Sequence, residues 1–313
     1  MLKIFVVLKL SVFFTLTLPG QGTKIIVDLN QPVECQKGEY KLVFQDDFEG
    51  NTLDTTKWYT FYPYGPETRP DSCAFCRTHT SANVYREQNV KVENGFLTLK
   101  SARETSNWFG AEYGYTSGMV HSKQAFTTYS KYEIRCKLPK GKHQWPAFWV
   151  FGWSTEFDVF EFICRGPRKP EFSIHKWWKS ECPDQKKVSR GAPCYSSQTR
   201  IVDFGIDFSE DFHTFTLEYE PHMIKYYIDG IMIRYIPRYY DIKGRPINTC
   251  NLGPGRYLTE AAFPNDGEPV QVIASQSVCK KFKDKKVVWP NFMEVDYIRV
   301  YQKEVQQDLR PLK

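Results

Sequence analysis

Short runs of β-forming residues, separated by turn residues, constrain the fold of this chain more than any other feature. The runs are rich in Val, Ile, Thr, Tyr and Phe, and no long stretch repeats apolar residues at the helical period of 3.6. We expect strands at residues 40–44, 95–100, 132–138, 147–152, 213–219, 224–228, 231–236, 270–273 and 293–301. This pattern predicts an all-β fold, a sandwich or jelly roll of two antiparallel sheets.

One hairpin turn is specified by the dipeptide Asp229-Gly230, which separates IKYYI from IMIRYI. A two-residue turn of type I′ needs positive φ at both central positions, and Asp and Gly tolerate this. Residues 165–205, in contrast, show little strand pattern. We expect them to form a long functional loop on the rim of a binding face.

The first 22 residues have the features of a secretory signal peptide. Lys3 precedes an apolar stretch that Lys9 interrupts, and small residues near positions 20–22 suit cleavage. The apolar run after Lys9 is only about nine residues, too short to span a bilayer. We therefore expect a signal peptide over 1–22, one domain over 23–313, an extracellular monomeric product and no stable membrane insertion.

The cysteines agree with export. All of them follow the signal peptide, and several should be paired in an oxidising compartment: Cys35, Cys73, Cys76, Cys136, Cys164, Cys182, Cys194, Cys250 and Cys279. Their odd number, nine, leaves at least one thiol free or intermolecular. The CAFC segment lacks a second pair of zinc ligands, so we interpret it as a structural loop.

The charge of the chain is mild. The formal net charge is +6 and the basic residues are scattered, which argues against a nucleic-acid partner. An anionic glycan stays open as a partner.

The segment STEFDVFEF, residues 154–162, alternates acidic and apolar residues and then loses step. In a regular strand Glu156 and Glu161, five residues apart, would face opposite sides. A bulge at residues 159–160 would return Glu161 to the face of Glu156 and Asp158, and send Phe157, one bulge residue and Phe162 to the core. An edge or solvent-facing strand is the alternative, but it does not explain the break in step.

The three acids suggest glycoside hydrolysis. Two glutamates about four strand steps apart, roughly 13 Å between Cα atoms, would lean inward on a concave sheet. Their carboxyl groups would then reach the roughly 5–5.5 Å separation of retaining glycosidases. Asp158 between them would hold the proton or orient the nucleophile, because clustered carboxylates force their pKa values apart.

Tryptophans surround the acids along the chain, at positions 145, 149, 153, 177 and 178. Flat aromatic rings stack on the apolar faces of sugars, so we expect Trp145, Trp177 and Trp178 to form sugar subsites. Trp149 fits a subsite or the core equally well.

The segment WPAFWVFG (residues 145–152), followed by EFDVFE (156–161), resembles glycoside hydrolase family 16, whose signature in its bulged form is Glu-x-Asp-x-x-Glu. Further similar segments follow in the family's order, at residues 42–58, 115–126, 132–149, 213–230 and 293–302. The resemblance implies a concanavalin-like β-jelly roll with a concave glycan-binding cleft. It also implies endo-acting hydrolysis with retention of configuration.

On the matching positions, the resemblance implies that Glu156 is the nucleophile, Glu161 the general acid/base and Asp158 an assisting carboxylate. His175 matches a histidine that lines the family's cleft. No cofactor is required for catalysis in the family. Some relatives carry a structural calcium ion, whose ligands here would be Asp47, the carbonyl of Gly95 and Asp296, although many members have glutamate in place of Asp47.

The bulged spacing is similar to the laminarinase, agarase and carrageenase branches. We therefore expect a secreted endo-β-glycanase whose polysaccharide substrate is a β-1,3-glucan. One alternative is a galactanase acting on agar, carrageenan or another sulphated galactan. Another is a non-catalytic β-glucan-recognition protein, although such binders usually lack one or both catalytic glutamates and this chain keeps all three acids.

Overall fold

The computed structural model describes residues 38–63, 77, 81–127, 129–177, 195–250, 252–280 and 287–303, together with the backbone of two strands near the N-terminus. The expected signal peptide, the CAFC loop and Trp178 lie outside these residues, apart from a two-residue strand at 15–16. Within the described part, a single 3-10 turn, η1 (Glu87–Asn89), is the only helical element, and no helix is long and apolar enough to cross a membrane.

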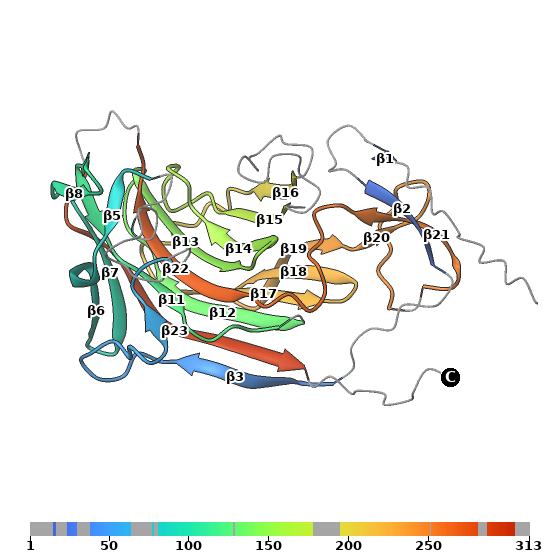
Figure 1. Cartoon of the computed structure of the whole chain (residues 1–313), viewed down its shortest axis with the longest axis horizontal. Coiled ribbons are helices and arrows are strands. Elements are labelled where there is room, and N and C mark those ends of the chain that lie inside the picture. Colours follow the sequence, from blue (N-terminus) through green and yellow to red (C-terminus); the bar gives the residue numbers. More distant parts are fainter. Residues whose placement is uncertain are drawn as a thin grey trace, which may run out of the picture.

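Two large sheets form the body of the molecule, as predicted (Figure 1). The ten-stranded sheet has the order β19 (Ile231–Pro237), β18 (Met223–Ile228), β17 (His213–Glu220), β12 (Ser130–Lys137), β23 (Asn291–Lys303), β7 (Phe96–Ala102), β10 (Tyr115–Ser117) and β5 (Asn83–Tyr85), with β3 (Tyr40–Asp46) on β23 and β6 (Val90–Glu93) on β7. The seven-stranded sheet has the order β16 (Tyr195–Ile201), β15 (Glu171–Trp177), β14 (Thr155–Glu161), β13 (Gln144–Phe151), β22 (Gln271–Val278), β11 (Met119–Ser122) and β4 (Trp58–Tyr59).

Two smaller sheets complete the described structure. One has the order β1 (Thr15–Leu16), β2 (Lys24–Leu29), β21 (Gly255–Glu260) and β20 (Tyr239–Tyr240), and the other pairs β8 (Ser106–Trp108) with β9 (Ala111–Tyr113). Strand β1 lies within the expected signal peptide, whose cleavage stays a prediction. Strand β2, just beyond it, pairs with β21 along six residues.

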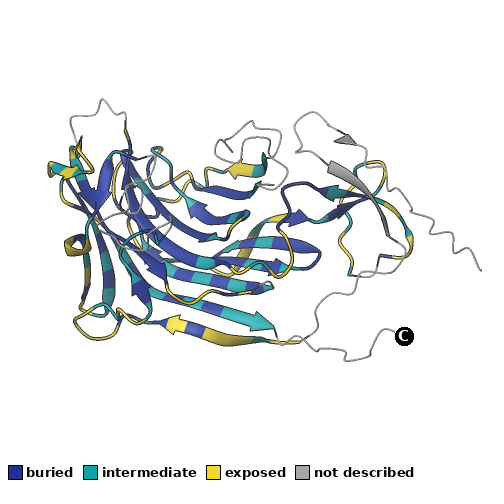
Figure 2. Ribbon diagram, in the orientation of Figure 1, coloured by how far each residue is buried: buried dark blue, intermediate teal, exposed yellow. Residues whose placement is uncertain are grey.

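The main core lies between the two large sheets. Alternate residues of each strand point into it, because side chains in a strand face opposite sides in turn. On β12, for example, Tyr132, Ile134 and Cys136 are fully buried in this core. Figure 2 shows the buried residues following the strands of both sheets and the exposed residues gathering in the connections and along β3.

The hairpin prediction is confirmed. Asp229 and Gly230 have φ values of 49° and 78°, and they join β18 to β19 in antiparallel register. Positive φ at both positions is the requirement of a type I′ turn.

The prediction of one long loop over residues 165–205 is wrong for two parts of this range. Residues 171–177 and 195–201 are β15 and β16, and both belong to the seven-stranded sheet. Strand β16 is an edge strand with the mostly polar sequence YSSQTRI, and only its last three residues are exposed. A half-buried strand of Ser, Gln and Thr shows no alternation of apolar and polar residues, so this strand could not be predicted from the sequence.

The described cysteines agree with an exported chain. Cys164 and Cys279 form a disulfide, Cys250 is also disulfide-bonded, and Cys136 is a buried free thiol. The free thiol confirms the expectation drawn from the odd number of cysteines. The remaining cysteines lie outside the described residues.

Candidate active site

Strand β14 contains the predicted bulge. On one side Asp158 pairs with Ser173 and Glu161 pairs with Glu171. Between these two pairs, β14 therefore contains one residue more than β15. On the other side Phe160 and Asp158 pair with the adjacent residues Phe148 and Trp149 of β13. This extra residue is the mark of a β-bulge.

The bulge keeps the acids on one face. Phe157, Val159 and Phe160 are buried in the core between the sheets, so both bulge residues point inward, one more than expected. Glu156 and Glu161 are partly exposed on the opposite face. Because β14 lies between β13 and β15, the alternative of an edge strand is wrong.

The turn that leads into β14 is fixed by Glu268. Its carboxylate accepts hydrogen bonds from the backbone nitrogen of Ser154 (2.5 Å), the hydroxyl of Ser154 (2.8 Å) and the hydroxyl of Thr155 (2.8 Å). At Gly152 a Cβ atom would come 2.8 Å from Oε1 of Glu268, so only glycine allows this approach. The start of the acidic strand is thereby held against the segment that leads into β22.

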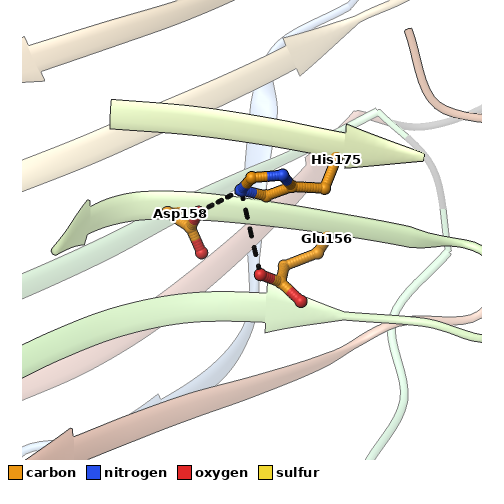
Figure 3. Close-up of side chains that lie close together, drawn as sticks. All are labelled: Glu156, Asp158 and His175. Atoms are coloured by element: carbon orange, nitrogen blue, oxygen red, sulfur yellow. Dashed lines mark hydrogen bonds and ion pairs between the residues drawn. The ribbon is translucent and has the colours of Figure 1, made fainter. Parts of the chain in front are cut away.

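His175 bridges two acids and a tyrosine. Its Nε2 lies 3.0 Å from Oδ2 of Asp158 and 4.0 Å from Oε1 of Glu156, as Figure 3 shows with Glu156 and Asp158 on one strand and the imidazole on its neighbour. The other ring nitrogen, Nδ1, lies 2.5 Å from the hydroxyl of Tyr195. Asp158 and His175 are 1% and 2% exposed, so the contact between them is almost completely shielded from water.

Glu161 lies in a different environment from Glu156. The indole Nε1 of Trp145 donates a hydrogen bond of 2.9 Å to its Oε1. Burial raises the pKa of Glu161 well above its usual range, and the charges of Asp158 and Glu171 raise this pKa further. The hydrogen bond from Trp145 and the imidazole of His175 lower the pKa of Glu161 and so oppose these effects.

Aromatic side chains form a row on the same face. Tyr62 lies 5.9 Å from Trp149, Trp149 lies 5.7 Å from Phe151, and Phe151 lies 6.2 Å from Trp177, measured between ring centroids. Tyr195 continues the row at 5.7 Å from Trp177. Because neighbouring rings 4.5–7 Å apart support each other, the row forms a continuous apolar strip beside the acids.

Trp149 belongs to this outer face and not to the core between the sheets. It is 8% exposed and packs in a second, smaller cluster with Tyr62 and Met119. Trp153 lies at the turn between β13 and β14 and is 75% exposed.

The expected calcium ligands do not fit such a site. Asp47 accepts a hydrogen bond of 2.7 Å from Arg299, and Asp296 accepts one of 2.5 Å from Arg135. A guanidinium in contact with each carboxylate already supplies the positive charge that calcium would bring. Neither aspartate joins a group of three ligand-bearing side chains in the described part of the chain.

The sequence missed two polar neighbours of the acids. Tyr195 follows a long segment without pattern, and Glu171 faces Glu161 only through the register of β14 with β15. No spacing along the chain indicates either contact.

The chain is similar in sequence to known glycoside hydrolases. The profile described as glycosyl hydrolases family 16 matches residues 78–254. The "Glucan endo-1,3-beta-glucosidase" of Cryptopygus antarcticus is 31% identical over 206 residues, which cover 61% of this chain and 67% of that one. The "Glucan endo-1,3-beta-glucosidase A1" of Niallia circulans is 26% identical over 299 residues, which cover 89% of this chain but only 40% of that one.

Solved structures share the fold. The catalytic domain of an endo-1,3-beta-glucanase (laminarinase) from Thermotoga petrophila superposes with a TM-score of 0.62 at 24% identity, covering 86% of this chain and all of that one. A laminarinase from Flavobacterium sp. superposes with a TM-score of 0.58 at 25% identity, covering 84% of this chain and all of that one. With the profile matching more than half of the sequence and the acids of β14 in the bulged arrangement, this chain belongs to glycosyl hydrolase family 16.

Proposed function

We propose that this chain is an endo-acting β-1,3-glucanase that hydrolyses internal bonds of the polysaccharide with retention of configuration. The observation that carries the proposal is the bulge of β14, which leaves Glu156, Asp158 and Glu161 on one face of the seven-stranded sheet. The row of aromatic rings on that face supplies surfaces for sugars. The similarity to the glucan endo-1,3-beta-glucosidases of Niallia and Cryptopygus and to the Thermotoga endo-1,3-beta-glucanase supports a β-1,3-glucan as the substrate.

In the first step of the proposed mechanism, the carboxylate of Glu156 attacks the anomeric carbon. The bond from this carbon to the glycosidic oxygen breaks, and Glu161 gives its proton to that oxygen. A sugar chain leaves with a free hydroxyl group, while the other remains as an ester on Glu156. This step needs Glu161 protonated, and its raised pKa supports that role.

In the second step Glu161, now a carboxylate, takes a proton from water. The resulting hydroxide oxygen bonds to the anomeric carbon as the ester to Glu156 breaks, which restores both side chains. Two displacements at one carbon return the original configuration.

Asp158 and His175 have a supporting role in this proposal. The contact of 3.0 Å between them fixes the ring beside Glu156, whose Oε1 is 4.0 Å from Nε2 of His175. A fixed polar environment holds the nucleophile in its attacking position and costs no reorganisation during the reaction. No cofactor enters either step.

The aromatic row would bind sugar rings along the sheet. Trp177 and Trp145 are partly exposed and offer ring surface, whereas Trp149 is 8% exposed and offers little. Trp178 stays a predicted subsite residue.

We also propose that residues 23–313 form one secreted, monomeric catalytic domain. The N-terminal sequence and the disulfide between Cys164 and Cys279 support export. N-terminal sequencing of the exported product and its elution volume in size-exclusion chromatography test the cleavage site and the monomer.

The test of the activity is a panel of polysaccharides. We expect new reducing ends from laminarin and fewer or none from mixed-linkage glucan, agarose and carrageenan. Release from agarose or carrageenan alone would establish the galactanase alternative, and binding of laminarin without release would establish the recognition protein. Glu156→Gln and Glu161→Gln should abolish release while laminarin binding persists.

A further inference from the structure

A buried carboxylate, Glu171, lies one strand away from Glu161 and forms an ion pair with the more exposed Arg165. Glu171, the first residue of β15, pairs in register with Glu161 and is 4% exposed. Its Oε2 accepts a hydrogen bond of 2.7 Å from Nη1 of Arg165. Arg165 follows Glu161 by four residues, in the connection between β14 and β15.

Residues that pair directly across two antiparallel strands point to the same face, with Cβ atoms about 4.5–5.5 Å apart. Phe172 and Ile174 point into the core, which confirms that Glu171 lies on the outer face with Glu161. Two carboxylates opposite one another repel, so this arrangement is unfavourable unless one of them is protonated or compensated. Arg165 compensates the charge of Glu171 through their hydrogen bond.

The position of Arg165 is fixed by its neighbour. Cys164 is joined to Cys279 at the end of β22, and its backbone nitrogen donates to the carbonyl of Gln144. The ion pair is therefore held by the sheet and does not depend on a long free loop.

We propose that the pair of Glu171 and Arg165 is a positioning element that keeps a second carboxylate beside Glu161 and thereby favours the protonated, acid form of Glu161. This inference rests on the proposed function, in which Glu161 is the general acid/base. Glu171 itself needs no contact with the sugar.

The groups that face Glu161 come from each packed element. They are Trp145 of β13, Asp158 of β14, and Glu171 and His175 of β15. Burial and the charge of Asp158 raise the pKa of Glu161 most, and Glu171 adds to them. Removing the charge of Glu171 should therefore lower this pKa, and the unpaired guanidinium of Arg165 would lower it further.

The experiment compares Glu171→Gln, Glu171→Asp and the double variant Arg165→Met/Glu171→Gln by the pH dependence of kcat/KM on laminarin. The fall of kcat/KM at high pH reports the loss of the proton from Glu161. For Glu171→Gln we expect this high-pH fall, the upper limb of the profile, to shift to lower pH by about one unit. At pH values above the limb, kcat/KM would then be about tenfold lower than in the wild type. Glu171→Asp should keep the limb, and the double variant should show a smaller shift of the same sign.

Glu260→Gln is the matched control, because Glu260 is equally buried but lies on β21 in another sheet. It should leave the upper limb in place. An unmoved limb in Glu171→Gln, or a uniform loss of activity at every pH, would overturn the proposal and assign the pair a structural role alone. If Glu171→Gln does not fold, the double variant decides by the same criterion.

A second measurement does not depend on activity. Carbon-13 NMR of the whole protein follows the titration of Glu161, which should move to lower pH in Glu171→Gln. If the wild type cleaves no polysaccharide while this titration moves, the proposed function fails and the effect of the pair stands. If the wild type cleaves laminarin while the titration does not move, the inference fails and the proposed function stands.

Discussion

Trp145 donates a hydrogen bond of 2.9 Å from its indole nitrogen to the carboxylate of Glu161 on the neighbouring strand. This donor stabilises the charged form of Glu161, while burial and the nearby Asp158 favour the neutral form and raise its pKa. A group that is first an acid and then a base must lose and regain a proton within one turnover. Opposing influences on its pKa suit both halves of the proposed reaction.

Trp145→Phe removes the donor and keeps an aromatic ring. We expect the pKa of Glu161 to rise, so the upper limb of kcat/KM on laminarin moves to higher pH, opposite to the shift expected for Glu171→Gln. A hydrogen bond to a charged group contributes about 1.5–3 kcal/mol. Without it, less of Glu161 is in the carboxylate form that acts as the base in the second step, so kcat should fall about tenfold or more. Trp153→Phe, at an exposed turn, is the control. A limb that stays in place with normal kcat would contradict the role of the indole.

Glu161→Ala should separate the two steps of the reaction. Hydrolysis of laminarin should fall by about 10²–10⁴, the contribution of a general acid/base. A laminari-oligosaccharide with a dinitrophenyl leaving group needs no proton, so its first step should stay fast and azide should restore turnover with a β-glycosyl azide as product. Glu156→Ala should instead give the α-glycosyl azide, because azide then attacks from the empty side of the nucleophile. Exchange of these two products would reverse the assignments.

The raised pKa of Glu161 also predicts a dependence of stability on pH. Below the unfolded-state pKa of about 4.3 both states are protonated and the buried site costs nothing. As pH rises through the higher folded-state pKa, the native protein loses stability, because the unfolded chain ionises freely and the folded one does not. Glu161→Gln should match the wild-type melting temperature in acid and exceed it at neutral pH, by about 2–4 °C for each kcal/mol relieved.

Calorimetry from pH 4 to pH 8 measures this difference. Glu210→Gln provides the comparison, because the ion pair of Glu210 with Lys140 is mostly exposed and should give no such gap. If the melting temperatures of Glu161→Gln and the wild type changed with pH in parallel, ionisation of Glu161 would not destabilise the folded protein.

Tyr195→Phe removes the hydroxyl that lies 2.5 Å from Nδ1 of His175 and keeps the ring stacked on the imidazole at 5.8 Å. A neutral hydrogen bond contributes about 1 kcal/mol, so kcat should fall about fivefold with little change in KM. Tyr235→Phe, on the exposed edge strand β19, should have no effect. A rise of KM at constant kcat would show that Tyr195 contacts the sugar and does not orient His175.

Removal of the disulfide in Cys164→Ala/Cys279→Ala should destabilise the protein by about 2–5 kcal/mol, since the bond closes a loop over a separation of 115 residues. The variant is preferable to a reducing agent, which would also break the disulfide of Cys250. Urea denaturation gives the change in midpoint. An unchanged midpoint would contradict the importance of this linkage for the fold.

The sequence predicted the features that depend on neighbours along the chain. The break in alternation at Val159 and Phe160 indicated the bulge, and Asp229-Gly230 indicated the hairpin. The resemblance to the family indicated His175 as a residue of the site, and the position of Trp145 and Trp177 near the acids made them candidates for sugar subsites.

Contacts that depend on register between strands could not be predicted. Glu171 faces Glu161 and Tyr195 meets His175 only because β14, β15 and β16 align as they do. The ion pairs of Arg135 with Asp296 and of Arg299 with Asp47, at the predicted calcium ligands, likewise leave no signal in the sequence. Polar strands such as β16 leave no periodic pattern to detect.

The bulge also determines how the strand would tolerate the deletion of one residue. Loss of the single codon for Val159 would bring the second glutamate to an even spacing of four from Glu156, so both would still face the sugar side. What would vanish is one side chain from the packing beneath and the local bend of the strand. A spacing of five with the bulge and a spacing of four without it are thus one codon apart, and both place the two glutamates on the same face.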